Sequence, residues 1–234
     1  MELDYTFMAK TFFKVWDGLG TTLGLTALSL LIAFPIAFYM AILRIRGHHF
    51  GSRFVQLYIS FVRGTPMILQ ILLLYSLLPS LLNVLVKMAG MNFNVFEAIN
   101  PFWYAVIIFS LNTIALLAEV FRSAILSIPQ GQMEAGVSTG LSEFQTYREV
   151  IIPQAMVVAL PAVCNITVNL IKGTSLAFLM TVKDVLAVGK IAASYGYNYI
   201  ESYLDVFFVY LIICTVIQLA YKVAEKHVGT FRAA

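Results

Sequence analysis

Long stretches of apolar residues without charged side chains leave few folds open to this sequence. Four are clear, at residues 18–43, 64–86, 98–118 and 150–171, and a fifth, at 203–221, is apolar except for Asp205 near its start. A helix needs roughly 20 apolar residues to cross the hydrocarbon core of a bilayer. Because only 12% of the residues are charged and 60% are hydrophobic, a water-soluble domain is excluded. The sequence predicts an all-α membrane protein, a single domain over residues 1–234 with five transmembrane helices.

The basic residues predict how these helices are oriented. Lys and Arg gather in the first connection and in the C-terminal tail, at Arg44, Arg46, Arg53, Lys222, Lys226 and Arg232. Because cytoplasmic segments carry the excess of Lys and Arg, we expect the C-terminus in the cytoplasm and the N-terminus outside. No run of basic residues indicates nucleic acid binding. The apolar segment 173–182 is too short to cross alone, so we expect it to extend the fourth helix or to bend away from it.

The N-terminal residues form a separate amphipathic pattern. Residues 1–17 place Phe7, Phe12 and Trp16 near one side of a helix. This favours an amphipathic elbow in the outer membrane interface. A frayed start to the first transmembrane helix is the alternative.

The connection between the third and fourth apolar segments, residues 128–153, is long and polar. Pro129 is expected to end the third helix, and a short helix follows from about Gln132. Gly140 interrupts that helix, and Ser142 caps a second helix that runs into the fourth span. Pro153 is expected to kink the chain where it enters the membrane. Connections in helical bundles usually have two to eight residues, so a functional segment is favoured over a plain connection.

The same segment resembles the EAA loop of ABC importer permeases. That pattern is Glu-Ala-Ala, three residues, Gly, nine residues, Ile, any residue, Leu-Pro, and this chain has Glu134, Ala135, Gly136, Gly140, Val150, Ile152 and Pro153 at those positions. It departs from the pattern at Gly136, Val150 and Ile152. "GLGTTLGLTALSL", "FVRGTPMILQ" and "NLIKGTSLAF" resemble segments of the permeases for polar amino acids. Gly173 stands where that family commonly has Asp.

The resemblance implies a fold and a set of partners. The fold would be that of a type I (MetI-like) ABC importer permease in a bacterial inner or plasma membrane. Residues 128–153 would form the cytoplasmic coupling loop, with Glu134, Ala135, Gly136, Gly140 and Pro153 serving contact with an ATPase. Two ATPase copies, a second permease copy (a homodimer) and an extracytoplasmic solute-binding protein would complete the assembly. ATP and Mg would bind the ATPase, since this chain has no phosphate-binding loop and would be a transport subunit, not an enzyme.

Polar residues inside the spans are candidates for a substrate path. Asn112 and Glu119 share one face of the third span, and Asn165, Asn169 and Lys172 share one face of the fourth. Gln70 lies in the second. A carboxylate at mid-span costs roughly 2.5–3.5 kcal/mol, so Glu119 needs water or a partner such as Arg122. The alternative role for the amides is hydrogen bonding between helices, and for Lys172 a side chain that reaches the outer surface.

Smaller features have structural interpretations. Thr65 is expected to cap the second span, with Pro66 in its first helical position and Arg63 among the lipid headgroups. Cys164 and Cys214 lie in apolar segments. We expect both to be small buried residues that form neither a disulfide nor a metal site.

The favoured function is thus the permease of an ATP-driven importer for polar amino acids. An ion-coupled secondary transporter is the alternative, and it would be expected to contain inverted repeats, which the sequence does not show. A membrane subunit that does not transport is the third possibility, and the polar residues within the spans argue against it.

Overall fold

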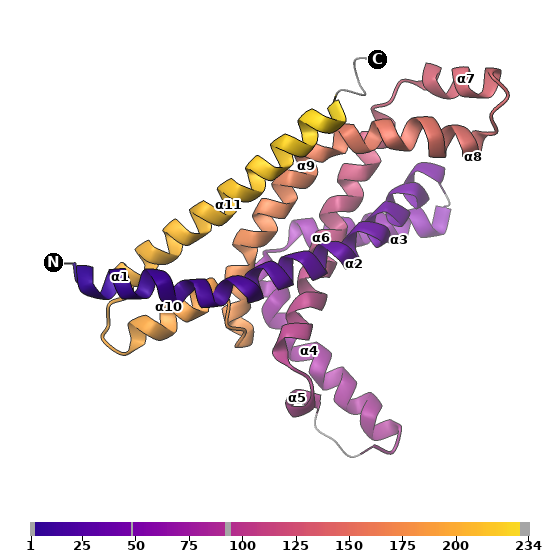
Figure 1. Ribbon diagram of the computed structural model, residues 1–234. Helices are drawn as coiled ribbons and strands as arrows, with labels where there is room; N and C mark the ends of the chain where they lie inside the picture. The colour runs from indigo at the N-terminus through magenta and orange to yellow at the C-terminus, as the bar shows by residue number, and fades with distance from the viewer. Residues whose placement is uncertain (1–2, 48, 92–94, 230–234) are drawn as a thin grey trace.

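The computed structural model describes residues 3–47, 49–91 and 95–229, and within these ranges the chain contains helices and no strand. Five helical segments are long and apolar enough to cross a membrane: Tyr5–Arg46, Met67–Met88, Pro101–Leu126, Glu143–Met180 and Tyr199–His227. The predicted five spans are therefore confirmed (Figure 1). The bounds differ from the apolar runs: the second and third segments begin inside their runs, at Met67 and Pro101, and the first begins well before its run, at Tyr5.

The first span is one continuous helical rod. Helix α1 (Tyr5–Lys14) passes through the short 3-10 turn η1 (Val15–Gly18) into α2 (Leu19–Arg46) without an intervening loop. The Asp4 carboxylate caps α1 by accepting a hydrogen bond from the Phe7 N–H at 2.9 Å. Gly47 ends α2 in the left-handed conformation, with φ of 69°, which glycine adopts at little cost. Residues Tyr5–Lys14 are therefore helical and joined directly to the first span, and the place of this helix in the outer membrane interface stays a prediction.

Helix α3 (His49–Gly64) has no counterpart among the expected elements. Val55, Ile59 and Val62 are buried in the core shared with α2 and α6. A second group of apolar residues on this helix is exposed: Phe50, Phe54, Leu57 and Phe61. The Tyr58 hydroxyl donates a hydrogen bond to the Leu111 carbonyl of α6. Burial raises the pKa of Tyr58 to about 12, so this hydroxyl keeps its proton and remains a donor.

Helix α4 (Met67–Met88) starts differently from the prediction. Pro66 is the N-cap residue, and no side chain forms a capping hydrogen bond there. The Thr65 hydroxyl instead donates back to the Phe61 carbonyl at 2.9 Å. The prediction that Thr65 caps this helix is wrong, because its hydroxyl bonds to the end of α3.

Helix α6 (Pro101–Leu126) is the centre of the fold, and most of its most apolar stretch is buried. It follows the short helix α5 (Val95–Ala98) and begins after Asn100, which caps it. Three alanines one turn apart on α2, Ala33, Ala37 and Ala41, are fully buried in the same cluster as Ala115 and Ala118 of α6. Small side chains let two membrane helices approach closely, which explains why α2 and α6 form the largest helix contact.

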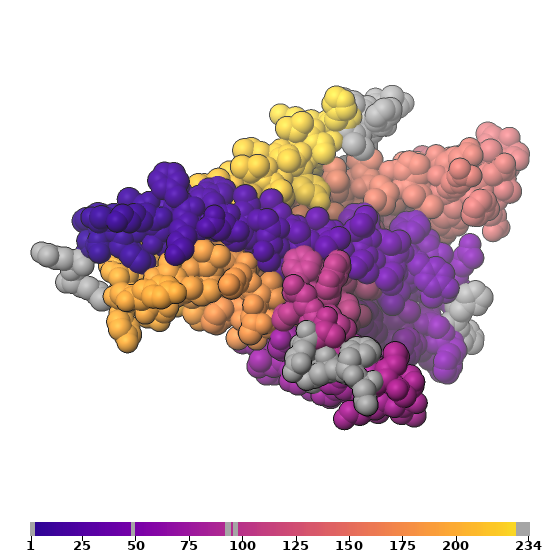
Figure 2. Space-filling view, turned by 60° about the horizontal axis from the view of Figure 1, so that its bottom comes forward, coloured from indigo at the N-terminus to yellow at the C-terminus, as the bar shows by residue number. Residues whose placement is uncertain are grey.

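The last third of the chain packs against the first span. Helix α9 (Ile152–Gly173) continues as the 3-10 segment η3 (Thr174–Met180), so residues 173–182 extend the fourth span as expected. The chain turns at Thr181, where φ is 60°. Helix α10 (Val185–Ser194) then lies along α1 and α2 (Figure 2), and α11 (Tyr199–Gly229) completes the bundle.

Asp184 holds this last third in place. Its buried carboxylate accepts hydrogen bonds from the Leu186 and Ala187 N–H groups and from the Tyr210 hydroxyl, the last at 2.8 Å. Burial raises the pKa of Asp184 above its ordinary value, although these hydrogen bonds oppose the shift. A Cβ on Gly18 would lie 2.5 Å from the Asp184 backbone. The backbones at Gly18 and Asp184 therefore approach each other to a distance that only glycine permits.

Candidate functional site

The polar connection folds into a helical hairpin of α7 (Gln130–Ser138) and α8 (Glu143–Thr146), which projects from one end of the bundle (Figure 1). Pro129 is the N-cap residue of α7, and Gly140 separates the helices with φ of 92°. Ser142 and Gln145 form a capping box, in which each side chain bonds to the backbone N–H of the other. The predicted interruption at Gly140 and the predicted cap at Ser142 are confirmed.

The two helices of the hairpin touch at Gly136. A Cβ on this residue would lie 2.4 Å from Cγ2 and 2.8 Å from Oγ1 of Thr146, whose side chain is fully buried. The Thr146 hydroxyl donates to the Ser142 carbonyl at 3.0 Å, which fixes its position. Gly136 is buried, and a larger residue there would clash with α8 of its own chain. Glu134 and Ala135 beside it are exposed.

The hairpin is joined to the fourth span without a break. A π-helical turn, Tyr147–Ile151, connects α8 to α9, and the helical segment runs from Glu143 to Met180. Pro153 is the second residue of α9, one residue beyond this turn. Proline has no N–H to donate and its ring crowds the carbonyl four residues earlier. A wider turn at this place accommodates both effects, so the irregularity expected from Pro153 takes the form of a π-helical turn.

Gln70 and Asn112 are brought together in the core. The Gln70 amide donates to the Val62 carbonyl at 2.8 Å and to the Thr65 hydroxyl at 2.8 Å, and its oxygen accepts from the Asn112 amide at 3.0 Å. Gln70 is buried and Asn112 half-buried. These bonds tie α4 both to the end of α3 and to α6. The arrangement matches the role of amides as links between helices.

Glu119 is held by two arginines. Its carboxylate pairs with Arg122 on the same helix, as predicted, and also with Arg44 at the end of α2. The Arg44 pair was not anticipated, because the two residues are 75 positions apart. A hollow of about 500 Å³ adjoins this cluster, with Arg44, Gln56, Ser60, Arg63 and Glu119 among its lining residues.

The polar residues of α9 have a different environment. Asn165, Asn169 and Lys172 are all exposed, on one face as predicted. The side chains of these three residues form no hydrogen bond or ion pair with another described residue, although the Lys172 carbonyl accepts a hydrogen bond from the Ser175 hydroxyl at 2.7 Å. A polar face is unfavourable against lipid hydrocarbon, so this side of α9 needs water or another protein surface.

Neither cysteine is in a disulfide; Cys164 is half-buried and Cys214 is buried. Over the part of the chain that the structure describes, no three His, Cys, Asp or Glu side chains are grouped as metal ligands would be.

Comparison with known proteins connects this fold to membrane transport. Residues 33–230 match the family described as binding-protein-dependent transport system inner membrane component. A probable amino-acid permease protein, YxeN of Bacillus subtilis (strain 168), is 34% identical over 224 residues, which are 96% of this chain and 95% of that protein. The histidine/lysine/arginine/ornithine transport system permease protein HisM of Escherichia coli (strain K12) is 33% identical over 216 residues, 90% of this chain and 87% of that one.

A solved structure supports the same conclusion. The crystal structure of an amino acid ABC transporter with histidines superposes with a TM-score of 0.81 and 27% sequence identity, covering 97% of this chain and all of the other. The likeness spans the hairpin as well as the membrane helices, because nearly the whole of both chains is aligned.

Proposed function

The chain belongs to the family of binding-protein-dependent transport system inner membrane components, and we propose that, as the permease subunit of an ABC importer, it carries polar amino acids. The observation that carries the proposed substrate class is the similarity, over at least nine-tenths of this chain, to permeases named for amino acids. This similarity supports an amino acid as the substrate. The solute-binding protein would select which amino acid is carried.

The α7–α8 hairpin is the proposed contact with the ATPase. Its exposed surface carries Glu134 and Ala135, and a carboxylate there suits a basic partner surface. The Gly136–Thr146 contact makes α7 and α8 one unit, and the helical segment Glu143–Met180 joins that unit to the membrane. Gly140 lies in the turn between α7 and α8, and Pro153 lies at the start of α9, where the hairpin joins the fourth span. When the ATPase moves α7, the movement would be carried into the fourth span.

The exposed polar face of α9 is the proposed wall of the substrate path. Asn165 and Asn169 offer amide groups and Lys172 a cation, which suit the carboxylate and amino groups of a zwitterion. A face of this kind is costly against lipid, so the second wall would come from another permease copy, most simply an identical chain. Gln70, Asn112 and Glu119 are assigned to holding the helices together, because their polar atoms are already engaged within the chain.

The proposed orientation follows from the positive charges. The hairpin lies at the same end of the bundle as the C-terminal end of α11 (Figure 1), and the C-terminal part of α11 carries Lys222 and Lys226. With the basic end in the cytoplasm, the hairpin faces a cytoplasmic ATPase pair and the N-terminus lies outside. The outer side would receive the solute-binding protein.

Uptake by the purified complex in vesicles tests the proposal. The permease is reconstituted with its ATPase and binding protein, and uptake of a labelled polar amino acid mixture is measured with ATP inside the vesicles. We expect uptake that requires ATP and is competed by unlabelled polar amino acids. Uptake driven by a proton or sodium gradient without the ATPase would refute the importer assignment in favour of ion-coupled transport.

Replacement of Glu134 by arginine tests the coupling surface. Glu134→Arg is expected to lower uptake per ATP hydrolysed, because it reverses the charge presented to the ATPase. Asp17→Arg is the matched control, since Asp17 is an exposed carboxylate in η1, remote from the hairpin in Figure 1. Equal loss in both variants would contradict the proposed role of α7.

A further inference from the structure

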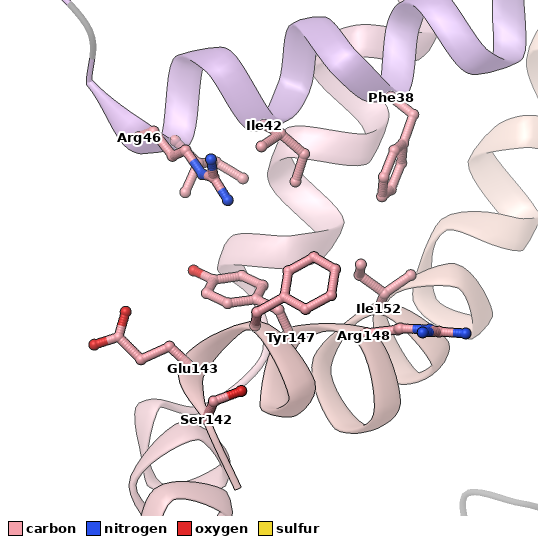
Figure 3. Close-up of a pocket in the computed structure, with 10 residues that line it drawn as sticks. Phe38, Ile42, Arg46, Ser142, Glu143, Tyr147, Arg148 and Ile152 are labelled. Carbon is pink, nitrogen blue, oxygen red and sulfur yellow. The ribbon is translucent and has the colours of Figure 1, made fainter.

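A groove of about 720 Å³ separates the C-terminal end of α2 from α8 and the π-helical turn. Its apolar lining comes from both sides, with Phe38, Ile42 and Ile45 from α2 and Phe144, Tyr147 and Ile152 from the opposite wall. Figure 3 shows Phe38 and Ile42 directed from α2 toward Tyr147 and Ile152 across the open space. The volume falls within the range of about 300–1,000 Å³ that is usual for small-molecule sites.

The polar lining of the groove has an excess of positive charge. Arg46 lies at one end and Arg148 at the other, and Glu143 is the acidic residue of the lining (Figure 3). Both arginines are exposed. The ion pairs of the described residues are those of Glu119 with Arg44 and Arg122, so neither groove guanidinium is neutralised by a carboxylate. The lining therefore carries a net charge of one positive unit, which suits a ligand with one negative charge.

The groove lies where the membrane meets water. Helix α2 is apolar through Leu43, and Arg44 and Arg46 follow at its end. The opposite wall, α8 and the π-helical turn, is polar on its outer side. The apolar part of the groove thus continues from the apolar length of α2. Arg46, at the end of that helix, is placed to lie among lipid headgroups, whereas Arg148 lies beside Ile152 on the opposite wall (Figure 3). Basic pockets between membrane helices at the cytoplasmic surface are typical sites for anionic lipid headgroups.

We propose that this groove binds one anionic phospholipid of the cytoplasmic leaflet. The phosphate lies beside Arg46 at one end of the groove, Arg148 adds positive charge at the other end, and an acyl chain runs along Phe38, Ile42 and Ile152 between them. A lipid in this position fills the space between the first span and the coupling hairpin and supports the hairpin from the membrane side. The assignment of the leaflet rests on the orientation given under the proposed function.

Lipid retention by the purified permease tests the site. Native mass spectrometry is carried out after addition of phosphatidylglycerol or of phosphatidylcholine. The unmodified chain is expected to retain one phosphatidylglycerol in preference to phosphatidylcholine. In Arg46→Gln/Arg148→Gln this preference should fall about 30-fold, because each basic side chain contributes roughly a factor of five at an anionic lipid surface.

Arg53→Gln is the matched control, since Arg53 is an exposed arginine of α3 that does not line the groove. It should leave the preference unchanged. The proposal is overturned if the double variant keeps the preference, or if Arg53→Gln loses as much of it. The measurement needs no ATPase and no transport, so failure of amino acid uptake would leave it unaffected, and loss of the lipid site would leave the proposed function standing.

A photo-crosslinking residue at Phe144 identifies the occupant directly in native membranes. Phe144 lines the groove and is 67% exposed, so a reactive group there reaches whatever fills it. Crosslinks to phospholipid support the proposal. Crosslinks mainly to a second copy of the permease or to the ATPase would show that protein occupies the groove and would refute it.

Discussion

Gly136→Ala introduces one methyl group at the contact between α7 and α8. The added carbon would lie 2.4 Å from Cγ2, 2.8 Å from Oγ1 and 3.1 Å from Cβ of Thr146. Rotation of the threonine side chain cannot relieve all three contacts, so the helices must separate. Overpacking of this kind costs about 1–3 kcal/mol, and the better helix propensity of alanine offsets up to ~1 kcal/mol. We expect a net destabilisation of the hairpin of about 1–2 kcal/mol, and hence about 5–30-fold more of its open form.

Hydrogen–deuterium exchange of the α7 amides measures that opening, and uptake per ATP hydrolysed measures its effect on coupling. In Gly136→Ala the α7 amides are expected to exchange about 5–30-fold faster, and the coupling ratio should fall because α7 no longer moves as one unit with α8. Thr146→Ala removes Cγ2 and Oγ1, so the double variant Gly136→Ala/Thr146→Ala should recover most of the lost protection.

Gly131→Ala is the matched control on the same helix, because nothing lies within 4 Å of the Cβ that it adds. It is expected to leave exchange of α7 and the coupling ratio unchanged or slightly improved. Equal behaviour of Gly136→Ala and Gly131→Ala would refute the assignment of Gly136 to the contact within the hairpin. Failure of Thr146→Ala to restore protection would place the clash elsewhere.

Four other substitutions test the assignments made inside the bundle. Glu119→Gln removes the carboxylate that pairs with Arg44 and Arg122. It should destabilise the permease in thermal unfolding by about 1.5–3 kcal/mol, whereas Glu149→Gln at an exposed site should not. A change in amino acid selectivity at unchanged stability would instead favour a role in the path. Gln70→Met removes the amide hydrogen bonds to Val62, Thr65 and Asn112 at the junction of α3, α4 and α6 and should lower stability by about 1–3 kcal/mol; an unchanged melting temperature would contradict the structural role. Tyr210→Phe removes the hydroxyl that donates to Asp184 and should cost about 1–3 kcal/mol, with Tyr203→Phe, an exposed tyrosine of the same helix, as the control. Asn169→Leu should reduce uptake while melting stays unchanged, because the side chain is exposed; normal uptake would exclude Asn169 from the path.

The parts of the fold set by local sequence were predictable. Apolar runs of span length identify five helices whatever they pack against, and Gly140 and Ser142 define the hairpin because their effects are confined to adjacent residues. Helix α3 has no uninterrupted apolar run, because its buried residues are interspersed with Arg53, Gln56 and Arg63. The segment is therefore too polar to be predicted as a span. Amphipathic periodicity at Val55, Ile59 and Val62 was the signal available.

Contacts between distant residues were not predictable from one sequence. The pairing of Glu119 with Arg44 depends on how α2 crosses α6, and the contact of Gly136 with Thr146 depends on the angle between α7 and α8. Thr65 lies between two helices, and its hydroxyl can either cap α4 or donate to a carbonyl at the end of α3. The sequence spacing does not decide between these two hydrogen bonds. The candidate path residues also depend on such contacts. The sequence shows that Gln70 and Asn169 are amides within spans, but only the structure shows that Gln70 is hydrogen-bonded within the chain and that Asn169 is exposed.

The length of the first span has a consequence for how the molecule sits in the bilayer. From Asp17 to Arg44 the helix rises about 40 Å, whereas the hydrocarbon core is only about 30 Å thick. If its whole apolar length lies within the core, the helix leans by up to about 40° from the bilayer normal, the upper end of the usual range; in Figure 1 it crosses α6 obliquely. At that tilt the N-terminal end of the helix is displaced sideways by more than about 20 Å from its C-terminal end, so the N-terminal helix overhangs a neighbouring part of the membrane plane.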